Sequence, residues 1–361
     1  MNFSQLAKTF CVFVFPLVIL GCGQGPENLK RGVFLKAEFS SDGKTLYALR
    51  NDGLLVWWDY AAKSKLGEHQ FGPPPSSLYT YNTFVLHPDG RRILTSHEDD
   101  SAFIWDLETK QQICELHPPD PNALGSHYAH QTFSPDGSLV ALIRQINNET
   151  VVLVLDSEIG AEIWRMEEVW KMDRGSPSNV FIFPDNARIL IGYNVYKIDL
   201  EKPLNSSRTA QPVHRFDSPG SVNVIHLSSD KKQVVIEITI PVPDQKRQNV
   251  FSSQSFLRKC DIDTYAVLSK YNLPSHHSPI QMTRDESLTL FHYFKAMEMP
   301  RKTYSYYMVM DGKMQRMKKP IRDYSLPVLL APDDKNLVVG SENGFSIRDI
   351  ETGKEIGLLL P

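Results

Sequence analysis

The 361-residue chain is 41% hydrophobic and 22% charged, as expected of a globular protein with a core, and its length suits two ordinary domains or one large repetitive domain. Its formal net charge of −3 argues against a nucleic-acid-binding surface. The four cysteines contain no C-x-x-C pair, which argues against the usual cysteine-based zinc sites, and two of them lie within the first 24 residues, so we expect no disulfide framework.

The first 24 residues have the features of an export signal. Lys8 supplies a weakly basic start, and residues 10–20 form an unbroken apolar run. A membrane-spanning helix needs about 20 apolar residues, so this shorter run favours a signal peptide.

The run ends in Ile19-Leu20-Gly21-Cys22, which resembles the lipobox of bacterial lipoproteins. The resemblance implies that residues 1–21 are removed and that Cys22 carries diacylglycerol and a fatty acid such as palmitate, which anchor the protein to a membrane of the bacterial cell envelope. The absence of aspartate at position 23 implies the outer membrane in a Gram-negative cell. Residues 22–32 then form a flexible tether. Leu20 departs from the family's pattern, and an ordinary cleaved signal or an uncleaved anchor with an incidental cysteine are the alternatives.

After the tether, one motif recurs at intervals of about fifty residues. In the copy FSPDG, Pro135 fixes φ, Asp136 bonds back to the backbone, and Gly137 adopts a left-handed conformation. The motif therefore predicts a reverse turn between two strands and not a catalytic sequence. Seven aspartates mark the copies: Asp42, Asp89, Asp136, Asp185, Asp230, Asp285 and Asp333.

A second aspartate follows a short strand in every copy, and in two copies it completes WWD at 57–59 and IWD at 104–106. These pairs, with NDG at 51–53, resemble the WD40-like β-propeller family. The resemblance implies an all-β fold over residues 33–361, in which seven four-stranded antiparallel blades close into a ring. Only two copies have the tryptophan and none has a clear Gly-His, so a TolB-like propeller, which shares the Ser-Pro-Asp-Gly turn, remains an alternative.

The strand pattern also predicts how the ring closes. The first blade begins at residues 33–39, and the last ends with its own fourth strand in EIGLLLP, so we expect no exchanged N-terminal strand. Trp58 and Trp105 are expected to pack between blades. Cys114 and Cys260 would lie three blades apart, so we expect them to remain unpaired.

Long connections all fall on the face that carries the b–c and d–a connections in this family: 70–82, 117–130, 167–179, and the hairpins 239–255 and 293–307 of blades 5 and 6. Variable connections on a repetitive scaffold commonly form binding surfaces. Aromatic and basic side chains give the candidate partner-binding surface: Tyr79, Tyr81, Tyr128, Trp170, Lys246, Arg247, Phe251, Arg301, Lys302 and Tyr304. Alternatively, these aromatics cover their own blades and the basic residues are simply solvated.

No nucleophile elbow, phosphate-binding glycine loop or H-E-x-x-H motif is present. His127 and His130, and the pair His276 and His277, lie in predicted loops without completing ligands, so no metal site is expected. The sequence favours a non-enzymatic scaffold that binds an unknown envelope protein, with no cofactor and no nucleic acid. The alternative is a propeller enzyme or small-ligand-binding protein acting at the central channel, which convergent carboxylates, histidines or arginines there would favour. A third possibility is a purely stabilising role in an envelope complex.

Overall fold

The computed structural model describes residues 32–72, 83–97, 101–116, 127–146, 149–168, 179–198, 211–216, 221–243, 251–273, 277–283, 286, 288–293, 305–310, 313–316, 327–341 and 344–361. In these residues the chain is built from β-strands and turns. The strands pair into seven antiparallel sheets of four, each made of four strands that are consecutive in the chain. We call these sheets blades 1 to 7 in chain order.

The first four blades cover residues 34–215. Blade 1 contains β1 (Phe34–Phe39), β2 (Thr45–Arg50), β3 (Leu54–Asp59) and β4 (Ser64–Gln70). Blade 2 contains β5 (Thr83–Leu86), β6 (Arg92–Ser96), β7 (Ala102–Asp106) and β8 (Gln112–Leu116). Blade 3 contains β9 (His127–Phe133), β10 (Leu139–Ile146), β11 (Glu149–Asp156) and β12 (Glu162–Glu168). Blade 4 contains β13 (Val180–Ile182), β14 (Arg188–Ile191), β15 (Asn194–Lys197) and β16 (His214–Arg215).

The remaining three blades cover residues 221–359. Blade 5 contains β17 (Ser221–Leu227), β18 (Gln233–Pro243), β19 (Phe251–Asp261) and β20 (Val267–Asn272). Blade 6 contains β21 (His277–Met282), β22 (Leu288–Tyr293), β23 (Ser305–Met310) and β24 (Lys313–Arg316). Blade 7 contains β25 (Val328–Leu330), β26 (Asn336–Ser341), β27 (Gly344–Asp349) and β28 (Glu355–Leu359).

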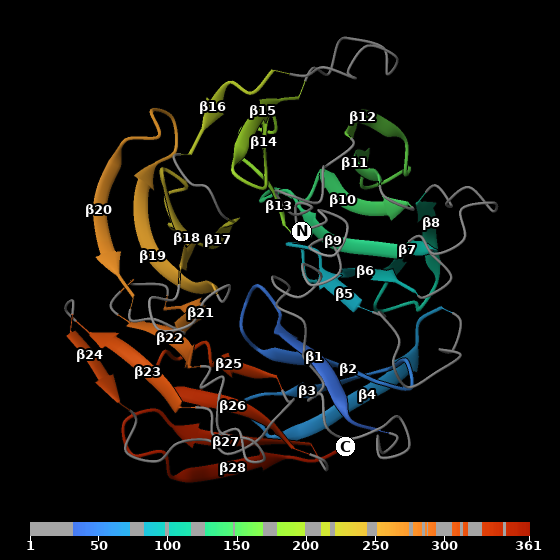
Figure 1. Ribbon diagram of the computed structural model, residues 1–361. Coiled ribbons are helices and arrows are strands. Elements are labelled where there is room, and N and C mark those ends of the chain that lie inside the picture. The colour runs from blue at the N-terminus through green and yellow to red at the C-terminus, as the bar shows by residue number, and fades with distance from the viewer. Residues whose placement is uncertain are drawn as a thin grey trace, which may run out of the picture.

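Figure 1 shows the blades arranged around a ring, with the first strand of each nearest the centre and the fourth at the rim. The second strands are apolar at consecutive positions because both of their faces are covered by neighbouring blades. In β10, for example, Ala141 and Ile143 pack toward blade 4, whereas Val140 and Leu142 pack toward blade 2. The core is therefore a set of apolar layers between blades, and the predicted propeller of four-stranded antiparallel blades is confirmed.

The ring closes where blade 7 meets blade 1. Trp58 is fully buried there and packs edge-on against Phe34 and Phe345, with ring centroids 5.7 Å and 5.6 Å away. Its indole Nε1 donates a hydrogen bond to the Leu360 carbonyl over 2.8 Å. Each of the two blades contains only its own consecutive strands, so closure involves no exchanged strand, as the strand pattern predicted.

The recurring aspartates that the structure describes cap the turns between the first and second strands, as predicted, whereas Asp285 lies outside the described residues. Asp136 Oδ1 accepts hydrogen bonds from Ser138 N at 3.0 Å and from Ser134 Oγ at 2.6 Å. The residue after each aspartate has a positive φ, whether it is glycine, as at Gly137 (φ 83), or another residue, as at Lys231 (φ 59). The turn therefore keeps its shape even where glycine is absent, at a cost in backbone strain.

The second aspartates cap the turns between the third and fourth strands. Asp106 Oδ1 accepts from Glu108 N at 3.0 Å and from Thr109 N at 2.7 Å. The two kinds of turn are also hydrogen-bonded to each other. In blade 2, Leu107 N, next to Asp106, donates to the carbonyl of Arg91 in the turn between the first and second strands over 2.8 Å. Asp199 and Asp311 lie outside the described residues.

In two predicted connections, some of the described residues belong to strands. Residues 117–130 were expected to form one connection, but β9 begins at His127, so Tyr128 and His130 lie in a strand. Likewise, β12 continues to Glu168 within the connection expected at 167–179. The reason is the length of the middle strands of blade 3: β10 and β11 each have eight residues, and their outer neighbours lengthen to pair with them.

Candidate functional site

Most of the predicted partner-binding surface lies outside the described residues. This applies to Cys22 and to Tyr79, Tyr81, Trp170, Lys246, Arg247, Arg301, Lys302 and Tyr304. The backbones of Tyr128 and Phe251 are placed: Tyr128 pairs with Arg144, and Phe251 pairs with Pro243. Both are strand residues and not loop residues. The aromatic and basic patch therefore remains a prediction.

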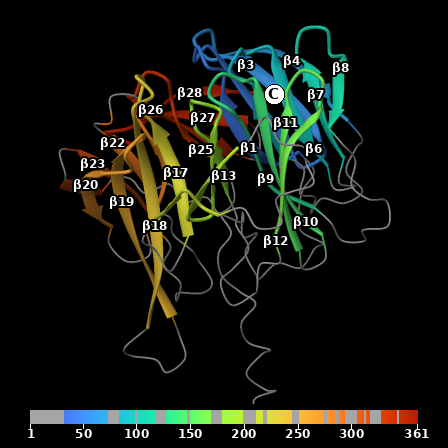
Figure 2. The same ribbon diagram turned by 90° about the horizontal axis from the view of Figure 1, so that it is seen from above.

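The described part of the face with the b–c hairpins has one prominent projection. The β18–β19 ladder runs from the Gln233–Asp261 pair to the Pro243–Phe251 pair. However, β17 pairs with β18 only as far as Thr239, and β20 pairs with β19 only from Phe256. Beyond these points residues 240–243 and 251–254 form a two-stranded ribbon that extends about 13 Å. Figure 2 shows β18 and β19 running past the other blades on one side.

A buried carboxyl group lies where this ribbon leaves the ring. Glu237 is only 4% exposed and accepts hydrogen bonds from Asn223 Nδ2 at 3.1 Å and from Thr239 Oγ1 at 3.3 Å. The Thr239 and Ser255 hydroxyls are 2.9 Å apart. Burial raises the pKa of Glu237, with the hydrogen bonds from its neighbours acting in the opposite direction. The sequence signal for this site was a lone carboxylate in the apolar strand QVVIEITI, and sequence analysis missed it.

A second group of polar side chains lies on β1, the innermost strand of blade 1, next to the innermost strand of blade 2. The Lys36 ammonium donates to the Phe84 carbonyl, lies 5.2 Å from the Phe84 ring centroid, and is 3.9 Å from Glu38. Desolvation by burial lowers the pKa of Lys36 and raises the pKa of Glu38. Even so, 36% of the Lys36 side chain and 34% of the Glu38 side chain are accessible to solvent. Both groups are thus surrounded by protein and still reached by water.

His130 belongs to the same inner region, on β9 of blade 3. Burial, with a smaller contribution from the positive charge of Lys36, lowers the pKa of His130 to about 4. The imidazole is therefore neutral at pH 7. Its Nδ1 has no hydrogen-bond partner among the described residues. The two histidines of HYAH were expected in a loop, whereas His130 is a strand residue on the inner side of the ring.

Inner-strand side chains also join consecutive blades elsewhere in the ring. Gln281 Oε1 of blade 6 accepts from Leu330 N of blade 7 over 2.8 Å, and Asn179 Nδ2 of blade 4 donates to the Val222 carbonyl of blade 5. An inner strand pairs on one side only, so its other edge presents free backbone groups. Polar side chains of the preceding blade form hydrogen bonds with some of these backbone groups. Sequence analysis could not detect these bonds because it considered each strand separately.

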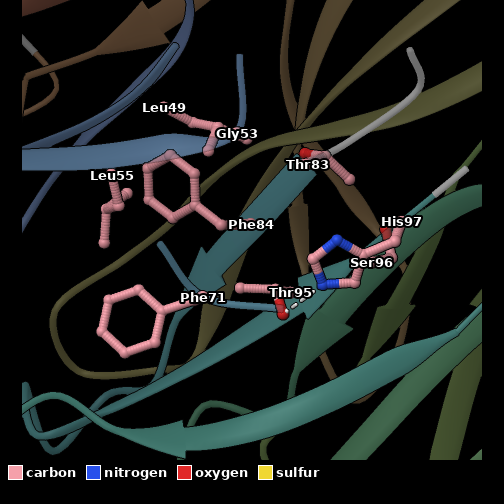
Figure 3. Close-up of a pocket in the computed structure, with 9 residues that line it drawn as sticks. All are labelled: Leu49, Gly53, Leu55, Phe71, Thr83, Phe84, Thr95, Ser96 and His97. Atoms are coloured by element: carbon pink, nitrogen blue, oxygen red, sulfur yellow. Dashed lines mark hydrogen bonds between the residues drawn. The ribbon is translucent and has the colours of Figure 1, made fainter. Parts of the chain in front are cut away.

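A small cavity lies between blades 1 and 2 (Figure 3). It has room for about one water molecule, far less than an organic ligand requires. At its wall, Thr95 Oγ1 accepts from Trp105 Nε1 at 2.9 Å and is 2.9 Å from His97 Nε2. Trp105 also packs edge-on against Phe71 at 5.7 Å. Trp105 and Trp58 therefore both pack between blades, as predicted.

The cysteines and histidines form no inorganic site in the described part of the chain. Cys114 in β8 and Cys260 in β19 are both free thiols, in blades 2 and 5. Within the described ranges, no group of three or more His, Cys, Asp or Glu side chains is placed to hold a metal ion. The same ranges contain no helix that is long and apolar enough to cross a membrane.

No protein-family model matches the chain, and a search of curated proteins finds no match. The structure alone therefore defines its class. It is an all-β propeller with four-stranded antiparallel blades.

Proposed function

We propose that the protein is a non-enzymatic docking scaffold that binds a protein partner through the face carrying its b–c hairpins. The observation that supports this most directly is the β18–β19 ribbon, which continues past the strands that flank it. The first-to-second-strand turns on the opposite face are, by contrast, short and built on one pattern. Irregularity confined to one face of a repetitive fold favours binding at that face.

The ribbon is also suited to recognition by its construction. A two-stranded ribbon is marginally stable alone, so a segment of this kind needs support from its surroundings. The buried Glu237 group provides polar bonds at its base. Asn223 joins β17 to β18, and the hydroxyls of Thr239 and Ser255 join β18 to β19. A supported base, above which β18 and β19 pair only with each other, is the arrangement that we expect of a docking element.

The test replaces residues 240–254 with a two-residue Asn-Gly turn, which closes the hairpin at the Thr239–Ser255 pair and keeps the Glu237 group. Wild type and this trimmed variant are expressed in the native cell, cross-linked and purified. The matched control carries Lys231→Ser and Lys232→Ser on the opposite face. We expect one partner to cross-link to wild type and to the control but not to the trimmed variant. Equal cross-linking of all three proteins would refute docking through this ribbon.

We further propose that Cys22 is lipidated and that it anchors the scaffold to a membrane of the cell envelope. The support is the apolar run followed by Ile19-Leu20-Gly21-Cys22. Growth with a labelled fatty acid should label wild type and leave Cys22→Ser unlabelled and in a soluble fraction. Labelling of the Cys22→Ser protein would contradict the assignment.

A small-ligand-binding role near the ring axis is the second candidate. The observation in its favour is the group of Lys36, Glu38 and His130 on the inner strands, since titratable side chains near the axis are the feature that distinguishes this candidate from a scaffold. The two roles use different surfaces and are compatible with each other.

A further inference from the structure

The two edges of the β18–β19 ribbon differ in their capacity to pair with another strand. In an antiparallel ladder, the backbone N–H and C=O groups of successive residues point alternately to the two sides of a strand. Leu273 N donates to Ser255 O over 3.0 Å, on the β20 side of β19. Ser253 and Phe251, two and four residues earlier, therefore present their backbone groups on this same side. The β19–β20 ladder ends before it reaches them, so no described strand pairs with this edge.

The opposite edge of the ribbon, along β18, carries two prolines. In the β18–β19 ladder, Pro241 pairs with Ser253 and Pro243 pairs with Phe251. Because Ser253 and Phe251 point away from β18, their partners point away from β19. Each proline therefore lies where an outward N–H group would otherwise be, and proline has none. The β18 edge of the ribbon cannot donate to an added strand, whereas the β19 edge can.

The β19 edge also lacks the charged residues that protect other edges of the molecule. Charged side chains or proline on an edge strand commonly prevent it from pairing with another chain. The fourth strand of every blade contains at least one lysine, arginine or glutamate, such as Lys270 in β20 and Glu355 in β28. Residues 251–254, Phe-Ser-Ser-Gln, contain neither a charge nor a proline. Two copies of this edge therefore meet without placing like charges opposite each other.

We propose that the β19 edge of the ribbon pairs with the same edge of a second copy of the chain. Antiparallel pairing about a two-fold axis at Ser252 places Phe251 of each copy opposite Ser253 of the other. Each of these pairs can exchange both of its N–H···O bonds. A two-fold axis at Ser253 would instead place Phe251 opposite Ser255, whose carbonyl already accepts from Leu273 N. The register centred on Ser252 is therefore favoured.

The prolines explain why this association stops at two copies. The combined sheet has the strand order β18–β19–β19–β18, so the β18 strands of the two copies form its outer edges. Both outer edges carry Pro241 and Pro243, and neither can donate to a further strand. The arrangement is closed, whereas an edge that stayed open would lead to fibres. One edge that pairs and one that ends the sheet favour a second copy over a strand from a different protein.

Cysteine substitution tests both the partner and the register. Ser252 of one copy lies opposite Ser252 of the other in a pair without hydrogen bonds, with Cα atoms about 4.5 Å apart, which a disulfide can span. The full-length Ser252→Cys protein, expressed in the native cell and treated with a mild oxidant, should form a disulfide-linked dimer on a non-reducing gel. Gln254→Cys is the matched control, because its two copies lie about 13 Å apart along the strands. We expect at least tenfold more dimer from Ser252→Cys than from Gln254→Cys or from wild type, which reports on the native cysteines.

Ser253→Pro separates the edge from the ribbon itself. Its ring replaces an N–H that points away from β18, so the β18–β19 ladder should be kept, as it is at Pro241 on the opposite strand. Ser252→Cys combined with Ser253→Pro should lose the disulfide-linked dimer, and Ser252→Cys combined with Ser253→Ala should keep it. The comparison of Ser252→Cys with Gln254→Cys does not depend on the folding of the proline variant.

Three results would overturn the proposal. They are the absence of a dimer with Ser252→Cys, equal dimer from Ser252→Cys and Gln254→Cys, and undiminished dimer when Ser253→Pro is added. If Ser252→Cys gave no dimer and Ser253→Pro removed a cross-link to a different protein, the edge would belong to that protein instead.

Pairing of two copies is separable from the docking function, although both use the ribbon. The variant trimmed at 240–254 lacks the edge and should lose both the second copy and the docked partner, whereas Ser253→Pro should lose the second copy alone. On a gel, a cross-linked second copy doubles the mass of the chain, and a docked partner adds its own mass. Failure of one proposal is therefore distinguishable from failure of the other.

Discussion

At the scale of single residues, the turn aspartates carry much of the information that specifies the fold. Burial opposes ionisation of Asp136, but hydrogen bonds from Ser134 Oγ, Ser138 N and the Asn186 amide outweigh it and lower the pKa of Asp136 to about 2. The bond from Asn186 comes from blade 4, so this carboxylate also connects two blades. The same residue type therefore acts locally, in a turn, and between neighbouring repeats.

The depressed pKa values predict acid sensitivity. Asp89 and Asp136 both have a folded-state pKa of about 2, below the ordinary value near 3.8. The folded state therefore binds protons more weakly than the unfolded state. The stabilisation from these carboxylates is complete above about pH 4 and is lost as the pH falls toward 2. Asp136→Asn should lower the free energy of unfolding at pH 7 by about 1 kcal/mol and reduce its loss between pH 4 and 2. Urea titrations at several pH values measure both effects. An identical acid dependence in the variant and wild type would contradict the assignment.

Two turn glycines should respond differently to substitution. A Cβ on Gly137 (φ 83) would collide with the His87 imidazole, whereas a Cβ on Gly90 (φ 71) would meet only Ser41 Oγ at 3.8 Å. Gly90→Ala should therefore cost about 1 kcal/mol from backbone strain alone. Gly137→Ala should cost about 3 kcal/mol, because strain and overpacking add. Chemical denaturation of both variants checks the difference, and equal losses would show that His87 can move aside.

At the scale of elements, the long β18–β19 hairpin needs the Glu237 group at its base. Glu237 has a raised pKa, so the folded state favours the protonated carboxyl, and its contribution to stability declines as the pH rises through the folded pKa. Glu237→Gln preserves the shape and most hydrogen bonds and should remove this pH dependence. Glu237→Leu removes the acceptor of the Asn223 and Thr239 hydrogen bonds and should cost about 1–3 kcal/mol. Denaturation at pH 5 and pH 8 compares the three proteins. A Glu237→Leu protein as stable as wild type would contradict the role of this group.

Sequence analysis predicted the elements better than the sites. The turns were predictable because Pro135, Asp136 and Gly137 act within a few residues of one another. The hydrogen bonds that Asn179 and Gln281 make between blades were not, because each joins residues that lie 43 or 49 positions apart in the chain. Glu237 was missed because Asn223, which donates to its carboxyl group, lies on the neighbouring strand β17.

At the scale of the whole molecule, stability depends on the closure between blades 7 and 1. Trp58→Phe keeps the aromatic packing but removes the hydrogen bond to the Leu360 carbonyl, and should cost about 1 kcal/mol. Trp105→Phe is a matched control because it loses the bond to Thr95 within blade 2. We expect amide hydrogen exchange in β28 to accelerate in Trp58→Phe and to be unchanged in Trp105→Phe. Equal exchange in β28 of both variants would show that the indole bond does not secure the closure.

The way in which the ring closes leaves one apolar face of blade 1 uncovered while the protein is being synthesised. Blade 1 leaves the ribosome first and blade 7 last, and no early strand is held back to complete the final blade. The face of blade 1 that carries Leu46 and Trp58 must therefore wait for Phe345 and Ile347 to be synthesised before it is covered. An open chain of blades with a bare apolar end is prone to aggregate or to pair with another copy. A chaperone that shields this end during synthesis would protect the molecule until its two ends meet.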